Sequence, residues 1–477
     1  MIIFNIFLHL FIILVFSSSI YGYGILFNKY IYTQKSNLGE VGLYGFVLIY
    51  FIVFIFHFFL SINFFLSLSL FIFGSFYFLL NKNHFIERLF YKRKYLFIFL
   101  LFFVSSLTVN LHDDIRLYQL PYINLVQEFK IIFGLVNIND FYAYSHGLYD
   151  IMSIFKLPYY NNRFIFLIPI IFLFFFTSAI IDYLSNTNEH KIIKFFIFFI
   201  LVLFLTKFYR SKEYGTDLPV TSLIFLSQIY FLKLFKNFDH VFFGKLMIFS
   251  VFAFFLKVYS FLIFVCLIYL LKYYQYIYKF IKHNYILTIF LILFTIISFA
   301  KTFILTGCLV YPEPKTCISK ENISWGYGSD LTKTRKDFLT AGSKGWRQYL
   351  RLNNYDDLIS AKDYLKTYKI KYLYYVLQDN DRERILLPII ISSLFFLILF
   401  LFYRKSIDKE SIPKPILILS SLTFLFWLYL FPISKYGGYA YILFFIYLIL
   451  YNLFNNFIYS QKFISSILIF CSIFFIL

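Results

Sequence analysis

Long apolar stretches recur along the whole chain, and short segments between them hold most of the charged residues. Each stretch has the length of about 16–25 residues that a helix needs to cross ~30 Å of hydrocarbon. In lipid such a stretch must be a helix, because every backbone amide needs a partner within its own segment. The pattern therefore predicts an all-α, polytopic transmembrane bundle of about 12–14 spans. We place these spans at 3–27, 41–59, 60–80, 95–110, 164–184, 192–206, 217–235, 245–257, 259–272, 285–302, 385–403, 415–431, 440–457 and 463–477.

The first stretch is predicted to be a retained span and not a signal peptide, because it lacks a basic leader and a small-residue cleavage site. The spans divide the chain into five segments. These are N-terminal transmembrane helices at 1–110, a loop with interfacial helices at 111–163, central transmembrane helices at 164–302, a polar segment at 303–384, and C-terminal transmembrane helices at 385–477.

Orientation follows from the Lys and Arg residues of the short loops, since cytoplasmic loops carry an excess of them. One set of loops holds 20 of the 44 Lys and Arg residues, and the opposite set holds nine. The other 15 lie in 301–384, which is too long to obey this rule. The first set is predicted to be cytoplasmic, so the N-terminus, 111–163 and 303–384 face outward. Its loops are 28–40, 81–94, 185–194, 233–245, 272–283, 403–415 and 456–462.

Composition supports the membrane assignment. Charged residues make up only 14% of the chain and hydrophobic residues 61%, whereas a soluble domain carries roughly 25% charged residues. A net charge of +20 would suggest nucleic-acid binding in a soluble protein. Here the loop lysines explain it, so the expected partner is the bilayer of the inner (plasma) membrane and no nucleic acid. Phosphate loops, dinucleotide fingerprints, zinc spacings, nucleophile elbows and transporter-like repeats are not found.

The most informative polar motif follows the fourth predicted span and contains His112, Asp113 and Asp114. A carboxylate at the membrane surface can act as a general base, or can hold a divalent cation such as Mg²⁺ or Mn²⁺. The structural alternative is that the two aspartates cap a helix that begins near Ile115. Both interpretations stay open at this point.

The next residues predict two interfacial helices. Apolar residues recur at helical spacing from Leu120 to Phe133, and Gly134 is expected to end this amphipathic helix. A second helix is expected from near Ser145 to a point before Pro158, and it carries His146 and Asp150. His146 is either a site residue or an interfacial polar residue without chemistry.

Two more polar residues stand at predicted outer helix ends. Asp217, with Pro219, fits a helix start, and is either a cap or a second acidic group that faces the first pair. Lys257 is the only charged residue in 246–271. A lone ionisable group at such a place is a functional hypothesis by default. Its ammonium could hold a phosphate, and snorkelling to the interface is the alternative.

The long outward segment contains Cys308 and Cys317, which flank Tyr311. A disulfide between these two cysteines is plausible if this side is oxidising. Residues 330–382 are polar with helical patches and are predicted to form a small folded cap. Near the C-terminus, Lys435 lies in a short outward turn whose two glycines allow close backbone approach.

Together these motifs resemble the GT-C superfamily of membrane glycosyltransferases, which includes protein O-mannosyltransferases, oligosaccharyltransferases and the bacterial aminoarabinose transferase. The resemblance rests on His112-Asp113-Asp114 in an outer loop and on Leu256-Lys257-Val258 at an outer helix end. The chain is also similar to bacterial multi-pass relatives of that superfamily. The matching pieces are Leu117-Tyr118-Gln119-Leu120-Pro121, Thr216-Asp217-Leu218-Pro219, Gly307-Cys308, Tyr311-Pro312, Trp325 and Lys435-Tyr436-Gly437-Gly438. One departure is that the acidic motif follows the fourth predicted span, whereas the superfamily usually places it after the first.

The resemblance implies transfer of a sugar from a polyprenyl-phosphate donor to a glycan, lipid or protein acceptor outside the cytoplasm. Asp113 or Asp114 would orient or deprotonate the acceptor hydroxyl. Lys257, with Arg116 or Lys435, would stabilise the departing phosphate. Further candidates for the site are His112, Tyr118, His146, Asp217 and Tyr311.

Two other functions remain open from the sequence. An O-antigen polymerase or ligase would also have many spans and outer cations, but would use a diphosphate-linked oligosaccharide. A flippase or transporter of lipid-linked sugars would place ionisable residues near the bilayer midplane. Apart from Lys257, the charged residues are expected in loops, which disfavours transport.

Overall fold

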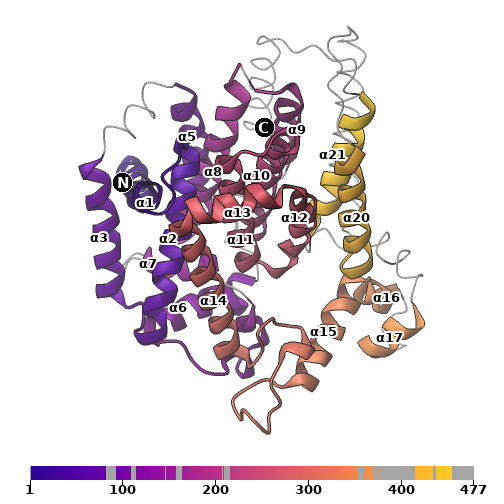
Figure 1. The fold of residues 1–477 in the computed structure, drawn as a ribbon. Coiled ribbons are helices and arrows are strands. Elements are labelled where there is room, and N and C mark those ends of the chain that lie inside the picture. Colours follow the sequence, from indigo (N-terminus) through magenta and orange to yellow (C-terminus); the bar gives the residue numbers. More distant parts are fainter. Residues whose placement is uncertain are drawn as a thin grey trace. The chain divides into compact units, whose positions relative to one another are not determined.

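The computed structural model describes residues 2–81, 93–108, 114–144, 147–156, 164–187, 189–206, 208, 215–352, 359–368, 375, 414–432 and 437–453. Over this part of the chain the structure is helical and contains no strand (Figure 1). Six helices in it are long and apolar enough to cross a membrane: Asn5–Tyr30, Leu38–Phe59, Leu167–Ser185, Asp217–Phe235, Val258–His283 and Tyr285–Thr306. The all-α prediction is thus confirmed for these residues, and the predicted spans 385–403 and 463–477 lie outside them.

In chain order the helices, with η for 3₁₀ or π helices, are α1 (Ile2–Tyr30), α2 (Leu38–Phe59), α3 (Phe64–Leu80), α5 (Arg93–Ser106), η1 (Ile115–Gln119), α6 (Leu120–Glu128), η2 (Leu135–Asn137), η3 (Asp140–Ala143), α7 (Gly147–Ile154), α8 (Leu167–Ser185), α9 (Lys191–Thr206), α10 (Asp217–Lys236), α11 (His240–Leu256), η5 (Val258–Ile263), α12 (Phe264–Leu270), η6 (Leu271–Tyr273), α13 (Tyr274–His283), α14 (Tyr285–Thr306), η7 (Pro314–Thr316), α15 (Ser329–Ser343), α16 (Trp346–Leu352), α17 (Ala361–Thr367), α20 (Lys414–Leu430) and α21 (Tyr439–Leu453).

The chain divides into two compact units. Unit 1 comprises Met1–Ser185, Tyr209–Val258 and Tyr273–Thr332, and unit 2 comprises Asn186–Phe208, Tyr259–Lys272 and Lys333–Leu477. Six charged residues form the three ion pairs described below, and all of them belong to unit 1: Glu40, Asp150, Asp217, Lys245, Lys257 and Lys301.

Helix α8 is the central helix of unit 1. In its most apolar stretch of 18 residues, 94% of the residues are buried, and the helix packs against α2, α5 and α10. A helix that is apolar all round needs protein or lipid to cover its faces, and in α8 the protein covers nearly all of them. The contact with α2 is close at Gly39, where a Cβ atom would lie 2.1 Å from the carbonyl oxygen of Phe175.

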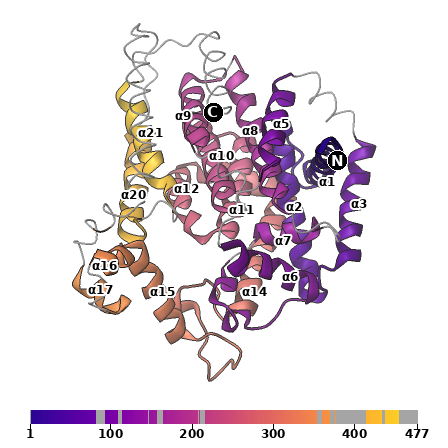
Figure 2. The same cartoon turned by 180° about the vertical axis from the view of Figure 1, so that it is seen from behind.

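Helix α1 packs against both α2 and α3, and the three lie side by side in Figures 1 and 2. Glycines form the crossing points. A Cβ atom at Gly24 would lie 1.8 Å from the carbonyl oxygen of Val41, and one at Gly22 would lie 2.0 Å from that of Gly74. Small residues allow helix backbones to approach closely where burial of apolar area gives little driving force, as in lipid.

Unit 1 has two ends, and the clusters of polar residues gather at them. At one end Glu40, in the first turn of α2, contacts Lys245 near the start of α11. At the other end Lys257 follows the last residue of α11. The helical rise of 1.5 Å per residue separates Lys245 and Lys257 by roughly 18 Å along the axis. We name these the Glu40 end and the Lys257 end.

The expectation that only Lys257 lies away from the loops was wrong. Lys245 lies within α11 and Lys301 within α14, and both side chains are buried. Each is close to a helix end and each pairs with a buried carboxylate. Both lysines stand near the end of an apolar stretch of the sequence, and that position does not show whether the side chain is buried among the helices.

Unit 2 contains the apolar helices α20 and α21, which pack against each other. Stacked rings of Phe424 and Phe444, with centroids 4.9 Å apart, join them. The predicted cap forms a separate small core, in which Tyr349 and Tyr364 are buried with Ala341. Trp346 ties this core together, because its Nε1 donates to the carbonyl oxygen of Ile359 at 3.1 Å.

Candidate functional site: polar clusters at the two ends of unit 1

The segment after α5 begins the Lys257 end. His112 and Asp113 lie outside the described residues, and Asp114 precedes η1. The Asp114 side chain makes no capping hydrogen bond, although the residue occupies the N-cap position. Its carboxylate is therefore not used for the capping role that was the structural alternative. Arg116 is exposed on η1, and the half-buried Tyr118 stacks on Phe141 with ring centroids 5.0 Å apart.

The amphipathic helix is shorter than predicted. It ends at Glu128, and Phe129 is already extended. The backbone beyond it bonds to other helices, since the Ile131 N–H donates to the carbonyl oxygen of His57 and the Gly134 N–H to that of Ile304. These hydrogen bonds to α2 and α14 replace the last turns of the helix. Gly134 has φ 66° and starts η2, so its role is to turn the chain after the helix.

The loop 129–144 packs on the disulfide-linked loop that begins the 303–384 segment. Cys308 and Cys317 form the disulfide that the sequence suggested. Cys308 and Tyr311 are buried together with Val136 and Ala143. Tyr311, which the resemblance put among the site candidates, therefore belongs to a small core. Its ring lies 5.5 Å from that of Tyr144.

Helix α7 is inserted into this end, and all eight of its residues are buried. Asp150 on α7 is fully buried, and its Oδ2 accepts from Lys301 Nζ at 2.7 Å. Tyr122 Oη donates to Asp150 Oδ1 at 3.1 Å. Lys301 also lies over the Phe54 ring, 3.8 Å from its centroid. Burial and the neighbouring Asp150 carboxylate raise the pKa of Tyr122 well above its ordinary value, so the phenol stays a donor.

Lys257 and Asp217 form a partly exposed ion pair at this end. Lys257 Nζ lies 3.4 Å from Asp217 Oδ1, and the two side chains keep 23% and 17% of their surface exposed. Lys257 is in an extended conformation at the break between α11 and η5. Asp217 is the first residue of α10 and faces Lys257. The ammonium is therefore paired with a carboxylate at a helix break, which the snorkelling interpretation does not require.

Tyr149 connects this pair with the acidic loop. It neighbours Asp150 on α7 and is 1% exposed. Its pKa is raised well above its ordinary value, first by burial and then by Tyr118, Asp217 and Asp114. These groups thus lie within electrostatic range of one phenol. We name Asp114, Tyr118, Tyr149, Asp217 and Lys257 the Lys257 cluster.

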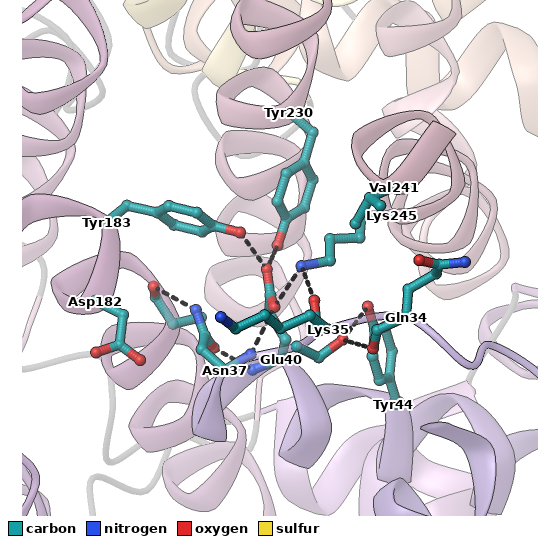
Figure 3. Close-up of polar contacts among 12 residues, drawn as sticks. Gln34, Lys35, Asn37, Glu40, Tyr44, Asp182, Tyr183, Tyr230, Val241 and Lys245 are labelled. Carbon is teal, nitrogen blue, oxygen red and sulfur yellow. Dashed lines mark hydrogen bonds and ion pairs between the residues drawn. The ribbon is translucent and has the colours of Figure 1, made fainter. Parts of the chain in front are cut away.

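The Glu40 end holds a different network, shown in Figure 3. Glu40 Oε2 accepts from Lys245 Nζ at 2.7 Å, and Oε1 accepts from Tyr183 and Tyr230 at 2.5 and 2.6 Å. The backbone N–H of Asn37 also donates to Oε2, while the Asn37 side chain caps α2 through the Glu40 N–H. This is a capping box joined to a buried ion pair. It links α2, α8, α10 and α11.

The Glu40 network and the Asp150–Lys301 pair were not identified from the sequence as sites. Lys301 offered the same signal as Lys257, because it is an isolated charge at the end of an apolar stretch. Glu40 offered another, since Asn37 and Glu40 have capping-box spacing before an apolar stretch. The lysine partners of Glu40 and Asp150 lie 205 and 151 positions away, and the two tyrosines that donate to Glu40 lie 143 and 190 positions away, so no local pattern could pair them.

A metal site stays a prediction. Among the described residues, no group of three or more His, Cys, Asp or Glu side chains is arranged to hold a metal ion. The Asp217 carboxylate is already paired with the Lys257 ammonium. Asp113, one of the two proposed ligands of Mg²⁺ or Mn²⁺, lies outside the described part, as do the site candidates His112, His146 and Lys435.

Comparison with known proteins gives one match. No curated protein and no solved structure matches the chain. The model of a domain of unknown function, DUF8201, matches residues 5–443, which is most of the chain. The chain therefore belongs to the DUF8201 family.

Proposed function

We propose that this protein is a multi-pass glycosyltransferase of the GT-C kind, with 12–14 spans in the inner (plasma) membrane. It transfers a sugar from a polyprenyl-phosphate donor to an acceptor outside the cytoplasm, in assembly of a cell-surface glycan. The Lys257 end is the extracytoplasmic end in this proposal. The six long apolar helices and the loop charges support membrane embedding in this sense.

The observation that carries the proposal is the partly exposed Lys257–Asp217 pair, with Asp114 at the same end. In the proposed step the acceptor hydroxyl oxygen attacks the anomeric carbon. The bond from that carbon to the phosphate oxygen breaks, and the phosphate leaves with the electron pair. The hydroxyl proton goes to Asp113 or Asp114, and Lys257 stabilises the departing phosphate.

Asp217 has a supporting role in this scheme. An ammonium on a flexible four-carbon chain can adopt many positions. The ion pair with Asp217 holds Lys257 at the N-terminal end of α10 before a donor binds. A phosphate, with a larger negative charge, would then compete with Asp217 for the same ammonium.

The two alternatives are weaker. A transporter needs ionisable residues near the midplane of the bilayer. Glu40, Lys245, Asp150 and Lys301 are buried, but they pair with one another near the ends of unit 1. An O-antigen polymerase or ligase would use a diphosphate donor, so the lipid that accumulates without the protein distinguishes it from the function proposed here.

The test is a lipid-linked sugar assay in a strain that lacks the gene. Loss of the protein should lead to accumulation of a polyprenyl-phosphate sugar, and the wild-type chain should reverse it. Lys257→Ala, and the double variant Asp113→Asn with Asp114→Asn, should fail to reverse it at normal protein level. Lys130→Ala is the control, since Lys130 is an exposed cation in the 111–163 segment, which also carries Asp114.

Two results would overturn the proposal. One is that no lipid-linked sugar accumulates when the protein is absent. The other is that Lys257→Ala and Lys130→Ala behave alike. Accumulation of a diphosphate-linked oligosaccharide instead would favour the polymerase or ligase.

A further inference from the structure

A cavity lies at the Glu40 end of unit 1, between α1, α2 and α3. It has a volume of about 360 Å³ and is bounded by the last turns of α1, the first turn of α2 and the end of α3. Ligand sites in proteins typically measure ≈ 300–1,000 Å³. The cavity is large enough for a small polar group with the first part of an apolar chain.

The helix crossings explain why this space exists. Gly22 and Gly74 bring α1 and α3 into backbone contact, and the Tyr23 hydroxyl donates to the Leu70 carbonyl oxygen at 2.7 Å. Next to that crossing, toward the C-terminal end of α1, Tyr21, Ile25 and Asn28 line the cavity. Residues at this spacing share one side of a helix. The cavity is thus the space between α1 and α3 next to the point where the two helices cross closely.

The lining has an apolar part and a charged rim. Ile25, Val41 and Leu80 supply apolar surface. Among the described lining residues Lys29 alone is charged, and no described ion pair engages it. Its ammonium lies 5.3 Å from the centroid of the Tyr30 ring. Asn81 also lines the cavity, and its Nδ2 donates one hydrogen to the Tyr77 carbonyl oxygen, which leaves the second hydrogen for a ligand. Such a lining suits an amphipathic anion.

The neighbouring face of α3 indicates where the ligand comes from. Phe73, Phe76, Leu79 and Leu80 are between 51% and 65% exposed there. In a membrane-embedded chain, such an apolar exposed face contacts lipid. The loops at this end carry the excess of Lys and Arg that marks the cytoplasmic side. That leaflet is the one with anionic lipids.

We propose that this cavity binds the headgroup of an anionic phospholipid from the cytoplasmic leaflet. The phosphate accepts from Lys29 Nζ and from the Asn81 amide. The first carbons of an acyl chain lie against Ile25, Val41 and Leu80. This proposal depends on membrane embedding but not on the glycosyl transfer proposed above.

The test is lipid retention measured by native mass spectrometry of the full-length protein. It is reconstituted with phosphatidylglycerol or with phosphatidylcholine of the same acyl chains. Wild type should retain phosphatidylglycerol in preference. Lys29→Gln should lower this retention by roughly tenfold or more, because the headgroup loses its charged hydrogen-bond donor. Ile25→Trp should lower retention of the lipid while leaving the charge in place.

The matched control is Lys35→Gln. Lys35 is an exposed cation in the loop that follows α1, and its substitution removes the same charge outside the cavity. The proposal is overturned if Lys29→Gln and Lys35→Gln give the same retention, or if both lipids are retained equally by wild type. It is also overturned if millimolar inorganic phosphate displaces phosphatidylglycerol, because the site would then bind soluble phosphate.

Discussion

The two ends of unit 1 use the same kinds of side chain in opposite ways. At the Glu40 end, the carboxylate and the Lys245 ammonium are 1% and 4% exposed, and four donors surround the carboxylate. At the Lys257 end, the ion pair is longer, 3.4 Å, and both side chains keep exposed surface. The Glu40–Lys245 pair is shielded from other partners, whereas the Lys257–Asp217 pair can exchange one partner for another.

This difference assigns a structural role to the Glu40 network, and it leaves the Lys257 pair available for the chemical role proposed above. A buried ion pair contributes little net stability compared with apolar residues, but the removal of one partner leaves an uncompensated charge. The Glu40 network therefore fixes how α2, α8, α10 and α11 meet. A partly exposed pair contributes little to stability, so a Lys257–Asp217 pair is better explained by what its ammonium can bind.

The largest expected effect comes from Lys245→Met at the Glu40 end. It leaves the buried Glu40 carboxylate without its cation, and we expect a loss of about 3–5 kcal/mol in the free energy of unfolding. Unfolding by a denaturing detergent, followed by tryptophan fluorescence, measures it. The double variant Glu40→Gln with Lys245→Met removes both charges and should be more stable than the single variant. Equal stability of the two would contradict the role assigned to this network.

The next effect concerns how the Lys257 end is held together. Replacement of both Cys308 and Cys317 by Ser should lower the free energy of unfolding by about 2–3 kcal/mol, because the disulfide restricts the unfolded chain. The same unfolding assay measures it, with and without reductant. Reductant should lower the stability of wild type to that of the double variant and leave the variant unchanged. Free thiols at both positions in freshly purified protein would refute the disulfide.

A smaller effect compares the two buried carboxylates. Tyr122→Phe removes the one described donor to Asp150 Oδ1, and a buried acceptor without a partner costs about 1–3 kcal/mol. Tyr183→Phe is the matched variant, because Glu40 Oε1 still accepts from Tyr230. We expect the Tyr122 variant to unfold at lower denaturant than the Tyr183 variant. The reverse order would show that the Glu40 network depends on both phenols.

The smallest stability effect is expected for Lys257→Met. The pair with Asp217 is partly exposed, so the free energy of unfolding should change by about 1 kcal/mol or less. Transfer of sugar should nevertheless fall by roughly 10²–10³, the usual result of removing a transition-state contact. A radiolabelled donor assay with purified protein measures the rate. Loss of stability similar to that of Lys245→Met would make Lys257 a structural residue and remove the contrast between the ends.

The sequence by itself determined the long helices, and it pointed to one charge and one disulfide whose positions the structure describes. Apolar length predicted α2, α8, α10 and α14, because a helix in lipid must satisfy its own backbone. Isolation in an apolar stretch identified Lys257, and sequence spacing suggested the Cys308–Cys317 bridge. Each of these inferences depends on local properties of the chain.

Only the tertiary structure decided the partners. Nothing local indicated that Lys257 pairs with Asp217, that Asp150 pairs with Lys301, or that the helix after Asp114 ends at Glu128 to bond α2 and α14. A side chain's polarity shows that it needs a partner when buried, and helix packing decides which partner is within reach. That is why the sequence could locate charges at helix ends and could not tell a closed network from an exchangeable pair.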